Sequence, residues 1–169
     1  VSTLLECARP KLPDFAENDV NAIIDHTCTL ISANAEHKSI ALALDLTSDI
    51  TLCHCDRDQL IQVFLNLIIN AIQHTPENGK ILISTQLQPR QVHIRIHDTG
   101  SGIPDEFKTP VFDPFFTRRE SGIGLGLTVV QQIVLAHQGR IFITDSPTGG
   151  ACFHVLLPTK SPQLTLTKN

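Results

Sequence analysis

The amino-acid sequence predicts a two-layer α+β sandwich, in which a mixed, mostly antiparallel sheet is covered on one face by about three helices. Segments with the apolar spacing of helices alternate along the chain with pairs of short segments rich in Ile, Val and Leu. Hydrophobic residues make up 41% of the chain, which is enough to form a core. The predicted order is helix, strand pair, helix, strand pair, loop, helix and strand pair.

The N-terminal third contains one predicted helix and one predicted strand pair. Residues 1–9 read as the last turns of a preceding helix, which Pro10 ends. Apolar residues at helical spacing predict a helix over 18–35, with an acidic residue near its start. Segments rich in Ile and Leu predict strands at 39–46 and 51–54.

The next helix has a clear start signal. Asp56 is predicted to be its N-cap, and Gln59, three residues later, would complete a capping box. The helix is expected to extend to about His74. Its apolar stripe consists of Leu60, Phe64, Leu67, Ile68 and Ala71.

A strand pair is predicted directly after this helix, at 80–87 and 91–97. The second strand alternates Val92, Ile94 and Ile96 with polar residues, so one of its faces is expected to be buried.

The last third begins with a long loop over 98–123, which is dense in Gly and Pro. Loops of this length inside compact domains are usually functional. A helix over 125–137 follows, with Gly139 as its predicted C-cap. The final strand pair is predicted at 140–145 and 151–157.

Composition and charge exclude several classes of protein. The formal net charge is −4 and the basic residues are scattered, so no nucleic-acid partner is expected. No apolar run approaches the roughly 20 residues of a membrane helix and no signal peptide is visible, so we expect a cytoplasmic domain without direct membrane contact. We expect it to be a fragment of a longer protein, whose N-terminal part could hold membrane segments.

The five cysteines are scattered, which indicates reduced thiols. Cys53-His54-Cys55 lacks the second ligand pair of a zinc site, so it is interpreted as part of a short strand.

An amide ladder on the second helix is the first feature that could carry chemistry. Gln62, Asn66, Asn70 and His74 recur every four residues and therefore share one face. Amides can offer oxygens to Mg²⁺ and N–H groups to phosphates. The alternative interpretation is a solvated polar face.

Two glycine-rich segments are the next features. Residues 98–103, Asp-Thr-Gly-Ser-Gly-Ile, follow a strand, where a carboxylate can accept a hydrogen bond from an exocyclic amine and glycines let a flat ring approach; the alternative is a simple turn. Residues 122–127, Gly-Ile-Gly-Leu-Gly-Leu, lead into a helix whose N-terminal N–H groups can bind phosphate. They match neither the Walker A motif nor the dinucleotide fingerprint.

An aromatic segment lies between them. Residues 112–119 read Phe-Asp-Pro-Phe-Phe-Thr-Arg-Arg. Exposed aromatic residues in a loop indicate docking to a partner or closure over a ligand. The alternative is a local hydrophobic staple.

The order of these four features resembles the Bergerat ATP-binding fold and, within that group, the catalytic ATP-binding domain of sensor histidine kinases of the nitrogen-regulation type. Residues 66–70 resemble the N box of that family, 98–103 and 122–127 its two glycine boxes, and 112–116 its F box. The resemblance implies three parts. These are the end of a dimerisation helix with a linker (1–17), the catalytic domain (18–158) and a polar tail (159–169).

The resemblance also implies a role for each motif residue. Asn70, helped by Asn66, would ligate Mg²⁺ and touch phosphate, while Arg118 and Arg119 would neutralise the β- and γ-phosphates. Asp98 would accept the adenine amino group. The full set of implied ATP contacts is Asn66, Asn70, Gln73, His74, Asp98, Gly100, Gly102, Ile103, Phe112, Phe115, Phe116, Arg118, Arg119, Gly122, Gly124, Leu125, Gly126 and Leu127.

Two positions depart from the simplest family pattern. Gln73 replaces a Lys that is common there, and His74 stands where the family often has an aromatic ring or His that packs on adenine. His74 is alternatively a surface residue at the helix end.

The activity implied is transfer of the γ-phosphoryl group of Mg-ATP to a histidine outside this chain. The implied partners are the protein's own dimerisation and histidine-phosphotransfer domain, in a homodimer, and the receiver domain of a response regulator. His26 lacks the flanking residues of an acceptor histidine and is interpreted as structural.

Two alternatives are another GHKL-type ATPase or anti-sigma-type protein kinase, and a nucleotide-binding module without catalysis. Hydrolysing members commonly carry a Glu four residues before the metal Asn, and here Asn66 stands there, which favours a kinase. The presence of Asn70 and Asp98 disfavours a module without catalysis.

Overall fold

The computed structural model describes residues 12–114, 116 and 125–159. The main elements are β1 (Phe15–Asp19), α2 (Val20–His37), β2 (Ala41–Asp45), β3 (Leu52–Asp56), α3 (Arg57–His74), β4 (Lys80–Gln88), β5 (Gln91–Asp98), α4 (Leu125–Ala136), β6 (Arg140–Asp145) and β7 (Ala151–Pro158).

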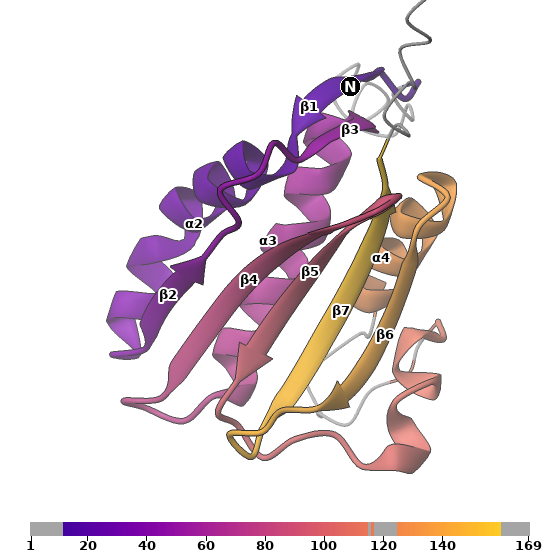
Figure 1. The fold of residues 1–169 in the computed structure, drawn as a ribbon. Helices are drawn as coiled ribbons and strands as arrows, with labels where there is room; N and C mark the ends of the chain where they lie inside the picture. The colour runs from indigo at the N-terminus through magenta and orange to yellow at the C-terminus, as the bar shows by residue number, and fades with distance from the viewer. Residues whose placement is uncertain (1–11, 115, 117–124, 160–169) are drawn as a thin grey trace, which may run out of the picture.

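The fold is the predicted two-layer sandwich (Figure 1). One sheet has the strand order β2-β4-β5-β7-β6, in which β2 and β4 pair in parallel and the other neighbours are antiparallel. Helices α2, α3 and α4 lie side by side across one face of this sheet (Figure 1). Within the described residues, no helix is long and apolar enough to cross a membrane.

The N-terminal segment differs from the prediction because it contains an unpredicted strand. β1 pairs antiparallel with β3 in a separate two-stranded sheet, from Phe15 opposite Asp56 to Asp19 opposite Leu52. The first helix therefore begins at Val20, two residues later than expected, with Asp19 as its N-cap. β1 was missed because its sequence, Phe-Ala-Glu-Asn-Asp, has little intrinsic strand preference. Residues 1–11, where a preceding helix was predicted, lie outside the described residues.

The start of α3 confirms one half of the predicted capping box and contradicts the other. Asp56 Oδ1 accepts a hydrogen bond from Gln59 N at 3.1 Å, as an N-cap should. The side chain of Gln59 does not bond back to the N–H group of Asp56: its Oε1 is buried and has no hydrogen-bond partner among the described residues. Asp56 N instead donates to Nε2 of His137, at the end of α4, over 3.1 Å. The predicted apolar stripe of α3 is buried throughout.

The two faces of β5 differ less in burial than the alternation of apolar and polar residues predicted. Val92, Ile94 and Ile96 belong to the core beneath the helices, as expected. His93, on the opposite face, is also buried, because His154 of β7 lies against it with the two ring nitrogens 2.8 Å apart.

The end of α4 shows that Gly139 is required for a different reason from the one predicted. The left-handed residue that ends the helix is Gln138, at φ 59°. A Cβ atom on Gly139 would lie 2.4 Å from the carbonyl oxygen of Leu156 in β7. Glycine is needed here because the backbone passes close to the sheet.

Candidate nucleotide site

The carboxylate of Asp98 is the centre of the candidate site. Asp98 is the last residue of β5, and only 4% of its surface is exposed. Its Oδ1 accepts hydrogen bonds from Gly100 N at 2.9 Å and Ala151 N at 3.2 Å. Within the described residues no hydrogen bond involves Oδ2, so this oxygen is left to accept a hydrogen bond from a ligand.

Two glycines shape the turn that follows Asp98. Gly102 has a φ of +76°, which favours glycine. A Cβ atom on Gly100 would lie 2.3 Å from the carbonyl oxygen of His74, the last residue of α3. The turn and the C-terminal end of α3 are therefore in direct contact, and two of the predicted motifs meet here.

The predicted amide ladder lies on α3 with its middle members partly covered. Asn66 and Asn70 are half-buried, whereas Gln62 and His74 are exposed. The ring of His74 folds back along the helix, with Nδ1 2.7 Å from the carbonyl oxygen of Asn70. Two half-buried amides on the helix whose C-terminal end touches the Asp98 turn fit a ligand site better than a fully solvated face.

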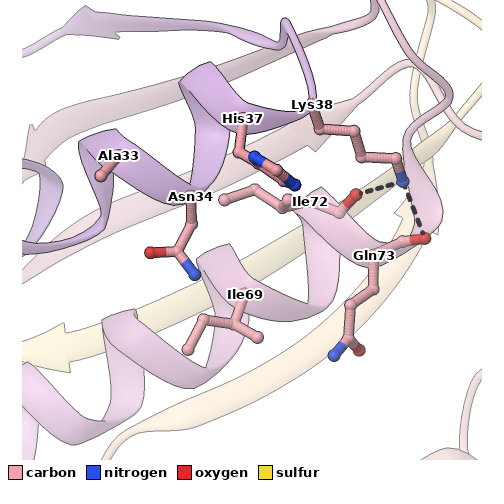
Figure 2. A pocket seen from close by; sticks show the side chains of 7 residues that line it. All are labelled: Ala33, Asn34, His37, Lys38, Ile69, Ile72 and Gln73. Carbon is pink, nitrogen blue, oxygen red and sulfur yellow. Dashed lines mark hydrogen bonds between the residues drawn. The ribbon is translucent and has the colours of Figure 1, made fainter.

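A separate cavity of about 700 Å³ lies between α2 and α3 (Figure 2). Its lining includes Ile69, Ile72 and Gln73 of α3, and Lys38, which follows α2. Lys38 Nζ donates hydrogen bonds to the carbonyl oxygens of Ile72 and Gln73, at 2.9 and 3.3 Å, and so stabilises the C-terminal end of α3. Gln73, a predicted ATP contact, is among the residues that line this cavity.

The aromatic segment is anchored to the core in its described part. It contains two short 3₁₀ turns, η1 (Asp105–Phe107) and η2 (Pro110–Phe112). The expectation that its aromatic residues are exposed is wrong for Phe112, which is buried and packs edge-on against Phe153 of β7. The carbonyl oxygen of Phe112 also accepts a hydrogen bond from Thr128 in α4.

Two more side chains of the predicted site, one aromatic and one aliphatic, pack against the core. Phe116 lies 5.6 Å from Phe107, measured between ring centroids, and is partly buried. Ile103 is also partly buried against the core.

The second glycine box is only partly within the described residues. Leu125, Gly126 and Leu127 form the first turn of α4. Leu127 packs against the core, and a Cβ atom on Gly126 would meet nothing within 4 Å. The predicted site residues Phe115, Arg118, Arg119, Gly122 and Gly124 lie outside the described residues.

The cysteine-histidine segment of β3 does not converge on a metal position. Because side chains alternate along a strand, Cys53 and Cys55 are buried while His54 between them is exposed. Burial raises the pKa of the Cys53 thiol to about 12, with a further contribution from Cys55. No group of three or more metal-ligating side chains occurs among the residues that the structure describes.

Residues 55–161 match the family of histidine kinase-, DNA gyrase B- and HSP90-like ATPases, which is more than half of the chain. The chain belongs to this family. Within it, the chain is similar to sensor histidine kinases. It is 37% identical to the signal transduction histidine-protein kinase AtoS of Escherichia coli (strain K12), over 94% of this chain and 26% of that protein. It is 34% identical to sporulation kinase E of Bacillus subtilis (strain 168), over 95% of this chain and 22% of that protein.

Solved histidine kinase structures share the fold. The catalytic domain of histidine kinase ThkA superposes with a TM-score of 0.81 and 31% identity, covering 86% of this chain and 96% of that domain. ThkA in complex with the response regulator protein TrrA gives a TM-score of 0.79 at 27% identity, covering 96% of this chain and 47% of that one. This chain is therefore an ATP-binding catalytic domain of the histidine kinase type. It spans about a quarter of the length of AtoS and of sporulation kinase E.

The sequence alone did not assign the last hairpin of this kinase-type domain to the site. Ala151 contacts the Asp98 carboxylate although 53 residues separate the two in the chain. The Thr148-Gly149-Gly150 turn was the available signal, but a turn motif does not reveal what it packs against.

Proposed function

We propose that this domain binds Mg-ATP and transfers the γ-phosphoryl group to a histidine on a dimerisation and phosphotransfer domain of the same protein, for relay to a response regulator. The observation that carries the proposal is the largely buried residue Asp98, whose carboxylate is fixed through Oδ1 while, within the described residues, no hydrogen bond involves Oδ2. Asn66 and Asn70 support the proposal because they are half-buried on α3, whose last residue, His74, contacts the turn after Asp98.

Adenine recognition is the role of Asp98 in this proposal. An adenine ring in the site would donate its 6-amino hydrogen to Oδ2. Because the acceptor would be a carboxylate oxygen held in place by backbone N–H groups, this bond would be stronger than one between neutral groups. Gly100 and Gly102 let the adjoining backbone form its tight turn, because a Cβ atom on Gly100 would clash with the carbonyl oxygen of His74 and Gly102 has a φ of +76°.

Phosphate binding is the role of the amides and of the second glycine box. Asn66 and Asn70 fit Mg²⁺ because it takes oxygen ligands and commonly combines one or two protein groups with substrate phosphates. When bound, Mg²⁺ would neutralise the phosphate charge that develops during transfer. Arg118 and Arg119 are proposed to add to this neutralisation.

Transfer to histidine is favoured over hydrolysis by the side chain at position 66. Asn66 is a neutral amide and cannot take a proton from an attacking water. Positioning and charge neutralisation are sufficient for phosphoryl transfer to a nucleophile supplied by another domain.

The partners follow from the relatives. AtoS and sporulation kinase E are named as kinases, and ThkA has been captured with a response regulator. We propose the same kind of partner here, a receiver domain, together with homodimerisation through the phosphotransfer domain and a cytoplasmic location.

The test is incubation with γ-labelled ATP and Mg²⁺, with and without the dimerisation helices as a separate polypeptide. We expect acid-labile label on those helices, none on this chain alone, and loss of label with Asp98→Asn. His26→Gln is the matched control and should label the helices like the unmodified chain. Rapid acid-labile labelling of this chain by itself would contradict the division of roles and make His26 a candidate acceptor.

A further inference from the structure

The hairpin between β6 and β7 contacts Asp98 in addition to the turn that follows this residue. Ala151 N donates to Oδ1 of Asp98, and Thr148 Oγ1 lies 3.5 Å from the carbonyl oxygen of Asp98 and can donate to it. The hairpin is itself ordered by hydrogen bonds. Ser146 N donates to the carbonyl oxygen of Gly150 at 2.7 Å, and the hydroxyls of Ser146 and Thr148 are 2.8 Å apart.

Gly150 lies closer to Asp98 than a residue with a side chain could. A Cβ atom at this position would be 2.1 Å from the carbonyl oxygen of Asp98 and 2.3 Å from its Oδ1. One of these atoms belongs to the backbone of a central strand, so it cannot move aside cheaply. Any side chain here would either rotate the Asp98 carboxylate or push the start of β7 away from β5.

The neighbouring Gly149 is constrained by its backbone conformation and not by a close contact. Its φ is +99°, so a side chain would strain the turn, but a Cβ atom there would meet nothing within 4 Å. A substitution at Gly149 therefore tests strain in the hairpin alone, whereas a substitution at Gly150 tests the contact with Asp98.

We propose that Gly150 and Ala151 are positioning residues for nucleotide recognition: they fix the Asp98 carboxylate in the orientation that presents Oδ2 to the 6-amino group of the purine. This inference rests on the proposed role of Asp98 in adenine binding. Two N–H groups on one oxygen, Gly100 N from the turn and Ala151 N from the hairpin, hold the carboxylate plane. With only the local N–H group the carboxylate could rotate, and the 6-amino group would lose a fixed acceptor.

The hairpin thereby sets the preference for a 6-aminopurine. The experiment measures the dissociation constants of ATP and of purine riboside triphosphate, which carries hydrogen in place of the 6-amino group. Calorimetric titration of the whole chain gives both constants. Their ratio reports only the bond to the amino group, so a general loss of stability or of phosphate binding cancels.

For the unmodified chain we expect ATP to bind about 10- to 150-fold more tightly than the analogue, as for a hydrogen bond to a charged group. In Gly150→Ala the ratio should fall towards 1. Gly149→Ala should keep the ratio of the unmodified chain, although its turn is strained. Thr148→Val, which removes one hydroxyl, should lower the ratio roughly two- to tenfold.

The outcomes distinguish the proposed adenine contact of Asp98 from the proposed positioning role of the hairpin. A ratio near 1 in the unmodified chain would show that Asp98 does not bind the amino group, and the proposed function would lose its adenine contact. A high ratio that persists in folded Gly150→Ala would overturn the positioning role alone. If Gly150→Ala does not fold, Thr148→Val decides, and an unchanged ratio in that variant overturns the inference.

Discussion

Two histidines face each other on the side of the sheet that the helices leave uncovered. His93 Nε2 and His154 Nδ1 are 2.8 Å apart, and His154 Nε2 is 2.7 Å from the hydroxyl of Thr144. The ring of His154 also stacks on Phe142, with centroids 4.5 Å apart. Burial, with the charges of His93 and Arg95, lowers the pKa of His154 from 6.5 to about 4.

The sign of the resulting pH dependence follows from that shift. Because the folded state holds His154 neutral, the unfolded chain binds the extra proton once the pH falls below 6.5. The stabilisation is complete above pH 6.5 and is lost as the pH falls to about 4. At about 1.4 kcal/mol per pKa unit the full shift corresponds to roughly 3.5 kcal/mol. His154 is partly exposed, so solvent screening reduces our expectation to about 1–2 kcal/mol.

Urea unfolding at several pH values between 7.5 and 4.5 measures this directly. We expect the free energy of unfolding of the unmodified chain to fall more steeply than that of His154→Gln, with a difference of about 1–2 kcal/mol accumulated across the range. His26→Gln, a change at an exposed histidine of α2, is the control and should follow the unmodified chain. Parallel curves for His154→Gln and the unmodified chain would refute the reasoning.

Three further predictions concern other parts of the domain. Asp98→Asn keeps an oxygen for the two N–H groups but turns a donor towards adenine, so ATP should bind about 10- to 150-fold more weakly in calorimetry with little change in urea stability. His137→Ala leaves Asp56 N buried without its partner, so the free energy of unfolding should fall by about 1–3 kcal/mol; an unchanged urea midpoint would contradict this. Phe64→Ala opens a cavity in the core and should cost about 3–5 kcal/mol in the same assay, against little effect for exposed Leu30→Ala.

The sequence by itself determined the main elements other than β1, and the chemistry of the candidate side chains. The apolar period of 57–74 predicted α3 together with its buried stripe, and Asp56 was predicted as its N-cap. The residue types at Asn66, Asn70 and Asp98, together with the family resemblance of the motifs that contain them, predicted the kind of ligand, because side chains carry their donors and acceptors wherever the fold places them. Such signals are local, and they depend on residues a few positions apart.

Only the tertiary structure decided which of these groups meet, and which partner satisfies each buried polar atom. The partner of Asp56 N is His137, 81 residues away, and not Gln59, three residues later, which the capping pattern predicted. The second N–H group on Asp98 comes from Ala151 across the β5–β7 ladder. The physical reason is that a buried donor requires an acceptor but does not specify its source, so strand register and helix packing make the choice.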